Sequence, residues 1–410
     1  MSTFLLGINY WPRRSAMYMW ERFDRGEIRE DMLRIRDIGL KVVRFFLRWD
    51  AFQPQPDIID QDMLKRLDAV MDEIANAQLY AMPTFFTGHM SGVNWLPEWT
   101  LDPATSSGRF RTYCAGMRQS GLGIGNFYID PLLRTQRLQV RTVGARYRNH
   151  PALFVWDLGN EFSNLREPDT PAQAAHWSEV LTHDLLETSD VGVTSGTHGE
   201  DITRDRHIRL SSLCAPYVFA TMHGYSVYSA FARGRLDGDV VPFLFDIAES
   251  CSGKRVLFSE FGNPACPPGT VSPYDRVPLP GEKPPEAKQL PANAAPYACL
   301  CEDEMAEYGY AVLERLQKRG ALGAFWWCWA DYDERLASLP PFDRATHELR
   351  FGIIRSDGTE KPVAEMLRGF VRENRPAVEP GQPFVSEDSY FAGLPQNVDA
   401  TYRKYVERYP

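Results

Sequence analysis

The sequence has no long hydrophobic run. No apolar stretch approaches the roughly 18 residues that a transmembrane helix needs. The first residues, MSTFLLG, carry no basic region, and their apolar segment is too short for a signal peptide. These two absences predict a cytoplasmic protein.

Cysteine is present but follows no pattern. The seven cysteines form no C-x-x-C pair and no group with the spacing of zinc ligands. An odd number of scattered cysteines is typical of reduced thiols, so the sequence predicts neither a disulfide nor a zinc site. They are Cys114, Cys214, Cys251, Cys266, Cys299, Cys301 and Cys328.

Positive charge is in deficit, because 45 Lys and Arg against 54 Asp and Glu leave a net charge of −9. This balance argues against nucleic acid or an anionic membrane as a partner. The Gly-x-Ser-x-Gly elbow of serine hydrolases is also missing. The glycines at 121–125 suggest a nucleotide loop, but no strand precedes them and no acidic partner fits. We therefore expect a flexible loop there.

Aromatic residues are abundant. They make up 12% of the 410 residues and include ten Trp, within a hydrophobic share of 44%. That share is ample for a large core, and the aromatic content exceeds what a core needs. Sugar-binding clefts use such rings as stacking surfaces, so the excess favours a carbohydrate partner.

Apolar runs alternate with amphipathic segments along the chain. Eight strands and at least seven helices in this order predict parallel strands with right-handed crossovers, the (β/α)₈ barrel of the α/β class. The strands are expected at 4–10, 42–47, 79–87, 154–161, 191–195, 218–223, 255–260 and 323–329. The helices are expected at 26–38, 60–78, 131–147, 171–187, 243–251, 301–319 and 362–372.

The pattern also predicts how the chain is divided. Residues 1–375 form the barrel, and residues 376–410 form a C-terminal tail packed on it. Three long segments, 90–130, 263–296 and 330–350, follow strand ends. In a parallel barrel such segments lie on the C-terminal face, where active sites are found.

Two of the expected strands end in glutamate. Residues 154–161 read FVWDLGNE, and residues 255–262 read RVLFSEFG. A glycosidase needs two such carboxyls, one to protonate the leaving oxygen and one to attack the anomeric carbon or activate water. Alternatively, Glu161 and Asn160 simply begin the next helix, because both residue types are common there.

These two strands resemble the retaining glycoside hydrolases of clan A, and family 5 (cellulase, mannanase and β-mannosidase type) in particular. The resemblance extends over roughly residues 7–368. It implies that Glu161 is the acid/base and Glu260 the nucleophile, with no metal or organic cofactor. It further implies substrate-binding roles for Arg44, His89, Asn160, His223, Tyr225 and Trp327. Trp326 and Trp329 compete with Trp327 for the role of sugar platform.

The resemblance leaves the sugar open. Residues 7–12, GINYWP, are also similar to the start of clan A β-galactosidases, and residues 351–362 to the ending of several exo-acting clan A enzymes. We expect a β-mannoside, cleaved by exo action or as a short oligosaccharide, with β-glucosides and β-galactosides as alternatives. A carbohydrate-binding barrel without activity and a transglycosylase are the other interpretations.

Overall fold

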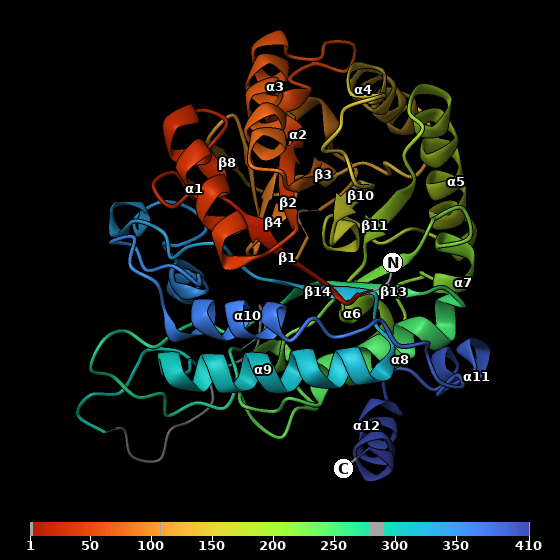
Figure 1. Ribbon diagram of the computed structural model, residues 1–410. Helices are drawn as coiled ribbons and strands as arrows, with labels where there is room; N and C mark the ends of the chain where they lie inside the picture. The colour runs from red at the N-terminus through yellow and green to blue at the C-terminus, as the bar shows by residue number, and fades with distance from the viewer. Residues whose placement is uncertain (1–2, 107, 279–290, 410) are drawn as a thin grey trace.

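Eight parallel strands form the central sheet of the protein. The computed structural model describes residues 3–106, 108–278 and 291–409, and within them helices surround this sheet (Figure 1). The strands are β1 (Leu5–Tyr10), β2 (Val42–Arg48), β3 (Tyr80–Thr87), β10 (Trp156–Asn160), β11 (Val193–Gly196), β12 (Ala220–His223), β13 (Val256–Phe261) and β14 (Gly323–Trp326).

The sheet closes into a barrel. Its strand order is β11-β10-β3-β2-β1-β14-β13-β12, so β1 lies between β2 and β14. The two ends of this order meet where the amide of Val218 donates to the carbonyl of Val193 (3.0 Å). The amide of His223 likewise donates to the carbonyl of Thr197 (2.9 Å). Each strand therefore has a neighbour on both sides, as the predicted (β/α)₈ fold requires.

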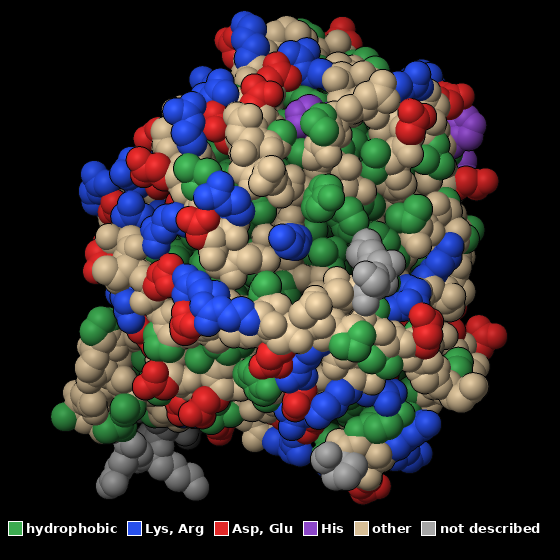
Figure 2. Space-filling model, viewed as in Figure 1, with side chains coloured by type: hydrophobic (Ala, Val, Ile, Leu, Met, Phe, Trp, Pro, Cys, Tyr) green, Lys and Arg blue, Asp and Glu red, His purple; other side chains and the backbone are tan. Residues whose placement is uncertain are grey.

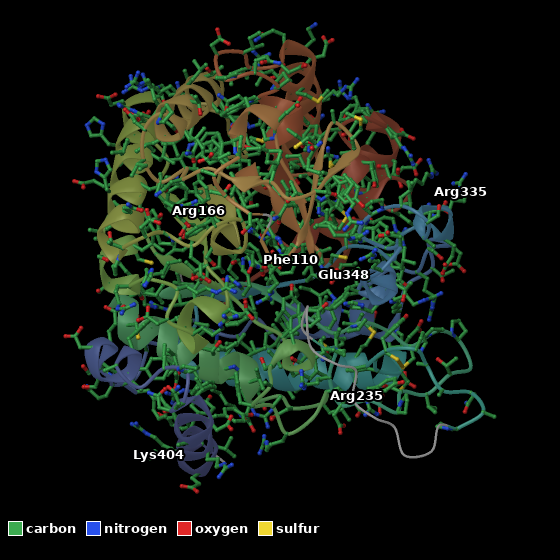
Figure 3. All side chains as sticks on the ribbon, turned by 180° about the vertical axis from the view of Figure 1, so that it is seen from behind. Phe110, Arg166, Arg235, Arg335, Glu348 and Lys404 are labelled. Atoms are coloured by element: carbon green, nitrogen blue, oxygen red, sulfur yellow. A yellow bond between two sulfur atoms is a disulfide. The ribbon has the colours of Figure 1, made fainter. Side chains whose placement is uncertain are left out.

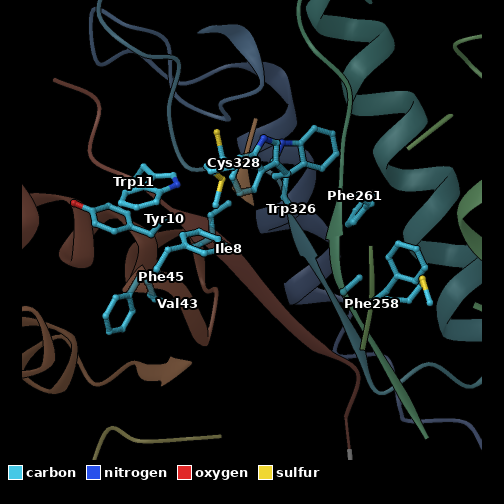
Figure 4. Packing of buried hydrophobic residues seen from close by; sticks show 14 of the residues in the cluster. Ile8, Tyr10, Trp11, Val43, Phe45, Phe258, Phe261, Trp326 and Cys328 are labelled. Atoms are coloured by element: carbon cyan, nitrogen blue, oxygen red, sulfur yellow. The ribbon is translucent and has the colours of Figure 1, made fainter. Parts of the chain in front are cut away.

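The strands are buried on both faces, which explains why their sequences are mainly apolar. All residues of β2, β10 and β13 are buried, as expected for a parallel sheet covered by helices. Figure 4 shows aromatic and aliphatic side chains of β1, β2 and β13 gathered in this core.

The helices that alternate with the strands begin and end within three residues of the predicted bounds. In α1, the Asp24 carboxylate accepts from the amides of Gly26 and Glu27, and Gly39 ends the helix at a φ of 97°. Helices α9 and α10 lie side by side (Figure 1). The larger helices are α1 (Arg25–Ile38), α3 (Gln61–Asn76), α4 (Leu132–Arg146), α5 (Pro171–Thr188), α8 (Val240–Ser252), α9 (Glu302–Arg319) and α10 (Pro362–Arg372).

Shorter helices lie in the connections and near the C-terminus. The α-helices among them are α2 (Trp49–Phe52), α6 (Glu200–Thr203), α7 (Leu210–Leu213), α11 (Glu387–Phe391) and α12 (Val398–Arg408). The 3₁₀ helices are η1 (Ala16–Tyr18), η2 (Glu98–Thr100), η3 (Phe162–Asn164), η4 (Ser226–Tyr228), η5 (Glu334–Leu336) and η6 (Thr346–Arg350).

The insertion after β3 contains strands that the sequence did not predict. Four of them form a small sheet in the order β4-β5-β7-β8, and β6 pairs with β9. The strands are β4 (His89–Met90), β5 (Val93–Trp95), β6 (Leu101–Asp102), β7 (Arg111–Cys114), β8 (Met117–Gln119) and β9 (Gly123–Ile124). Each has two to four residues, which is too short for a recognisable alternation. The prediction of a flexible loop at 121–125 is wrong for Gly123 and Ile124, which pair with β6.

The prediction that all cysteines are reduced is wrong for two of them. Cys266 and Cys299 form a disulfide across a sequence separation of 33 residues. Their separation in sequence gave no signal, because they are brought together by the pairing of Ala265 with Leu300. Cys114, Cys214, Cys251, Cys301 and Cys328 are free. Residues 279–290, within that segment, lie outside the described residues.

The C-terminal residues contact the barrel through α12. The Tyr402 hydroxyl donates to Asp237 (2.7 Å), and its ring packs edge-on against Phe243 (5.1 Å between centroids). The predicted boundary at residue 375 stays a prediction. On the surface, Lys and Arg side chains are interspersed with Asp and Glu (Figure 2). None of the helices in the described ranges has the length and apolar content of a membrane span.

Candidate active site

A cavity of about 920 Å³ opens where the barrel strands end. It lies at their carboxyl ends, because Glu161 directly follows β10, His223 ends β12 and Glu260 is the penultimate residue of β13. Seven of the eight residues predicted from the sequence line it: His89, Asn160, Glu161, His223, Tyr225, Glu260 and Trp327. The eighth, Arg44, is fully buried and bonds two of them, Asn160 and Glu260.

The chain turns sharply at the end of β10. Gly159 has a φ of 84° and Glu161 a φ of 45°, in the left-handed region that residues other than glycine rarely adopt. The Glu161 amide donates to the carbonyl of Gly196 on β11 (2.9 Å), which holds the turn. The Glu161 side chain makes no capping bond to η3, so beginning the next helix does not account for this residue.

Glu260 is held at both carboxylate oxygens. Nη1 of Arg44 donates to Oε1 (2.5 Å), and the Tyr225 hydroxyl donates to Oε2 (2.7 Å). Nδ1 of His223 lies 3.4 Å from Oε1. The side chain is only 5% exposed. A carboxylate with a guanidinium and a phenol as partners is fixed in place.

Arg44 connects four strands beneath the cavity. Besides Glu260, its guanidinium donates to Asp157 through Nε (2.8 Å), to Asn9 through Nη1 (3.0 Å) and to Asn160 through Nη2 (2.9 Å). Although burial disfavours its charge, the carboxylates of Asp157 and Glu260 hold the pKa of Arg44 above its ordinary value. The cost of burying this arginine is therefore offset by partners on β1, β10 and β13.

Glu161 has a different environment. Its Oε2 accepts from Nδ2 of Asn164 (2.9 Å), and Nδ1 of His223 lies 3.3 Å from its Oε1. Nε2 of His89 lies 3.9 Å from Oε2. Among the described residues, no Lys or Arg is within ion-pair distance of this carboxyl. At 17% its side chain is more exposed than that of Glu260.

The two carboxyls face each other across a short gap. One carboxylate oxygen of Glu161, one of Glu260 and a ring nitrogen of His223 all lie within 4.8 Å of one another. Burial lowers the pKa of His223 to about 3, so its imidazole is neutral near pH 7. A neutral imidazole has one N–H, so a proton on Nδ1 would be shared between the two carboxyls.

His89 and Asn160 form one wall. Nδ1 of His89 lies 2.8 Å from Oδ1 of Asn94, and the His89 carbonyl accepts from Nδ2 of Asn160 (3.1 Å). Burial lowers the pKa of His89 to about 4. Its ring packs against Phe110, with 4.4 Å between centroids.

Of the three tryptophans near the end of β14, Trp327 lines the cavity. Trp326 packs edge-on against Phe261 in the core and donates from Nε1 to the carbonyl of Phe351 (3.0 Å). Trp329 is also buried, with the guanidinium of Arg34 5.7 Å from its ring. Of the three candidates for the sugar platform, Trp327 is therefore a cavity residue, whereas Trp326 and Trp329 are core residues.

The sequence did not identify several polar and aromatic residues that line the cavity or bond Arg44 beneath it. Asn9 and Asp157 stand in buried strands, where a lone polar residue is itself a signal. The others come from loops whose sequences resemble no motif. They are Phe110, His198, Tyr228, His347 and Glu348.

Comparisons with known proteins identify similar chains. A family model of glycoside hydrolase family 42, described as β-galactosidase, matches residues 17–187. An exo-β-1,4-mannosidase from Opitutaceae bacterium strain TAV5 is 25% identical, with a TM-score of 0.69 over 90% of this chain and 59% of that one. This chain thus spans less than two thirds of that mannosidase. No curated protein matches the chain.

Two further structures cover almost all of this chain. A GH5_18 protein from Streptomyces cattleya in complex with GlcNAc is 19% identical, with a TM-score of 0.77 over 98% of this chain and 90% of that one. A variant of the same protein in complex with Manβ1-4GlcNAc is 20% identical, with a TM-score of 0.73 over the same shares. These similarities confirm the predicted (β/α)₈ fold.

Proposed function

We propose that this chain hydrolyses β-glycosides with retention of configuration. The proposal proceeds from the premise that the chain is a clan A glycoside hydrolase similar to family 5. The observation that carries the proposal is the pair Glu161 and Glu260, with carboxylate oxygens within 4.8 Å. Retaining enzymes place their carboxyls about 5–5.5 Å apart, and inverting enzymes about 6.5–9.5 Å. The two carboxyls also have unlike partners, which supports two different roles.

Glu260 is the nucleophile in this proposal. Arg44 and Tyr225 hold its carboxylate in place and aim it at the cavity. In the first step, a Glu260 oxygen bonds to the anomeric carbon as the bond from that carbon to the glycosidic oxygen breaks.

Glu161 is the acid and then the base. It gives its proton to the departing oxygen in the first step. In the second step it takes a proton from water as the water oxygen bonds to the anomeric carbon and releases Glu260. The greater exposure of Glu161 suits a group that meets both the leaving group and water.

Other cavity residues bind the sugar. The amide of Asn160 uses one N–H on the His89 carbonyl and its oxygen on Arg44, which leaves one N–H for a sugar hydroxyl. Trp327 provides a ring on which the sugar can stack. His89 and His223, both neutral near pH 7, can accept or donate hydrogen bonds without adding charge.

We propose a β-mannoside as substrate, attacked from its end or as a short oligosaccharide. The solved structures named as an exo-β-1,4-mannosidase and as a complex with Manβ1-4GlcNAc support this choice. Loops from several strands enclose the cavity, and two ion pairs join them across it, Arg109 with Glu200 and Arg111 with Asp343. An enclosed pocket suits a chain end better than the middle of a polymer.

The test is to follow the anomeric configuration of the product by NMR with 4-nitrophenyl β-mannoside, β-glucoside and β-galactoside. We expect the β-anomer to form first, and the mannoside to be cleaved with the highest kcat/KM. Glu161→Gln and Glu260→Gln serve as controls, and each should lose hydrolysis. Initial formation of the α-anomer, or the absence of hydrolysis with all three substrates, would contradict the proposal.

A second candidate is a β-galactosidase. It is favoured by the family 42 match over residues 17–187, which include Glu161 but not Glu260. The same substrate panel separates the two candidates, because a galactosidase would prefer the galactoside.

A further inference from the structure

Glu348 lines the same cavity, on η6 after β14, as do Glu161, Glu200 and Glu260. Its side chain is only 8% exposed. Oε1 accepts from the Tyr228 hydroxyl (2.7 Å), and Oε2 accepts from the Ser91 hydroxyl (2.9 Å). Seen from behind, Glu348 and Phe110 lie near the middle of the molecule, whereas Arg335 and Lys404 lie at its periphery (Figure 3).

This buried carboxyl has no cationic partner among the described residues. The nearest basic group is Nε2 of His347, 3.6 Å from Oε1. Burial lowers the pKa of His347 to about 4, so the imidazole is neutral near pH 7. By contrast, the buried carboxyl of Asp331, on the loop after β14, is paired with Lys361 (2.7 Å). A buried carboxyl without a cation is costly unless hydrogen-bond donors surround it.

The carboxylate has unused acceptor capacity. Two oxygens offer about four acceptor positions, and Tyr228 and Ser91 fill two of them. Both donors are hydroxyl groups. Glu348 lines the cavity, so the hydroxyls of a ligand there can donate to its remaining acceptor positions.

Glu348 is also close to the proposed nucleophile. The Tyr228 ring packs edge-on against that of Tyr225, with 5.4 Å between centroids, and Tyr225 donates to Glu260. Nε2 of His347 lies 2.9 Å from the Tyr228 hydroxyl, so that hydroxyl can accept from His347 while it donates to Glu348. The hydrogen bonds between His347 and Tyr228 and between Tyr228 and Glu348 therefore hold the Glu348 carboxylate beside the position of the sugar that Glu260 attacks.

We infer that Glu348 determines specificity by accepting hydrogen bonds from hydroxyls of the terminal sugar that do not react. This inference rests on the proposed glycosidase function and names a residue that the sequence did not. A neutral sugar offers several hydroxyl donors and carries no charge. An amino sugar would instead place a cation on the carboxylate, which is the competing outcome of the test.

A purely structural role makes a different prediction. Glu348 joins η6 to η4 through Tyr228 and to the insertion after β3 through Ser91, so it also ties three loops together. Ser91→Ala cuts one of these ties and leaves the carboxylate in place. This variant is therefore the matched control for loop anchoring.

The experiment uses the aryl β-glycoside that the wild type cleaves best and its monodeoxy analogues. We expect the wild type to lose roughly 10–100-fold in kcat/KM on the analogue that lacks the contacted hydroxyl. Glu348→Gln should have a lower kcat/KM than the wild type on the parent substrate. Its kcat/KM on that analogue should be less than threefold lower than its own kcat/KM on the parent substrate. Ser91→Ala should keep the wild-type discrimination. Glu348→Asp, which keeps the charge, is a second variant should Glu348→Gln not fold.

Three outcomes would overturn the inference. In the first, the kcat/KM of Glu348→Gln falls by the same factor on every substrate and the wild-type discrimination remains, as expected if the role of Glu348 is structural. In the second, Ser91→Ala loses discrimination as Glu348→Gln does. In the third, the wild type prefers the 2-amino-2-deoxy analogue and Glu348→Gln loses that preference.

Failure of the proposed function can be told apart from failure of this inference. Calorimetric binding of the methyl β-glycosides and their monodeoxy analogues to Glu161→Gln, with and without Glu348→Gln, needs no hydrolysis. Sugar binding that depends on Glu348, together with a wild type that hydrolyses none of the substrates, would support the inference and contradict the hydrolase.

Discussion

Glu161 and Glu260 end two strands with the same sequence pattern, yet their side chains have different partners. Glu260 bonds Arg44 and Tyr225, whereas Glu161 bonds Asn164 and faces two neutral histidines. The sequence places both carboxyls at the barrel mouth. The partners that distinguish them come from β2, η3 and the loop after β12, so only the fold assembles them.

Arg44 is the residue on which the geometry of Glu260 depends most. Replacing it by Met leaves Asp157 and Glu260 buried without their cation, which costs about 3–5 kcal/mol in the free energy of unfolding. Urea denaturation measures this loss, and kcat/KM should fall by roughly 100-fold or more. Arg36→Met is the control, because the exposed Asp37 is the ion-pair partner of Arg36 among the described residues and the change should cost less than about 0.5 kcal/mol. A cost below about 1 kcal/mol for Arg44→Met would contradict the role of Arg44.

Glu348 makes stability depend on pH. Burial, as the largest cause, raises the pKa of Glu348 to about 7, above its ordinary value of 4.5. The folded state therefore prefers the protonated form, and stability is lost as the pH rises from about 4.5 to about 7. Glu348→Gln removes this loss, so its unfolding free energy relative to wild type should rise by about 3 kcal/mol between pH 4 and pH 8. A difference that does not change with pH would contradict the burial of an unpaired carboxyl.

The sequence predicts candidate site residues where they occupy strands or follow them directly. Arg44, Asn160, Glu161 and Glu260 belong to this group, because an apolar run fixes their position in the barrel. Glu348 lies 22 residues beyond the last residue of β14, in a segment without periodicity. Its position depends on bonds to Tyr228 and Ser91, which no local pattern contains.

At the scale of elements, the insertion after β3 closes one side of the cavity. Its Arg111 on β7 bonds both carboxylate oxygens of Asp343, on the loop after β14 (2.6 and 2.7 Å). These side chains are 13% and 29% exposed, so water screens the pair only in part. The loops that enclose the substrate are thus joined by contacts distant in sequence.

We expect the pair Arg111 and Asp343 to stabilise the closed cavity. A double-mutant cycle with Arg111→Ala and Asp343→Ala should give a coupling energy of about 1 kcal/mol, and each variant should raise KM several-fold. Arg134 and Asp130, an exposed pair of the same residue types near the start of α4, are the control, with an expected coupling of about 0.3 kcal/mol. An unchanged KM in Arg111→Ala would show that the pair does not shape the site.

The elements that the sequence predicts well are those with a clear period. Strands buried on both faces and amphipathic helices of 11 to 18 residues such as α3 and α9 were placed within a few residues. The short strands of the insertion and the Cys266–Cys299 disulfide were missed. Both depend on pairing between segments rather than on a property of either segment alone.

At the scale of the whole molecule, the barrel brings residues that end or follow six of its eight strands to one opening. Arg44 on β2 bonds side chains of β1, β10 and β13, so the floor of the cavity is fixed by the closed sheet itself. The walls come from loops, which differ most between enzymes of this fold. The chemistry of the proposed function thus depends on the barrel, and the choice of sugar on the loops.

The most direct test of the account is covalent labelling with a 2-deoxy-2-fluoro β-mannosyl fluoride, or the corresponding sugar of the best substrate. The fluorine slows both steps and the good leaving group restores the first, so the glycosyl-enzyme should accumulate. Peptide mass spectrometry should find one labelled peptide, modified at Glu260, and no label in Glu260→Gln. A label on Glu161, Glu200 or Glu302, or inactivation without any covalent label, would contradict the account.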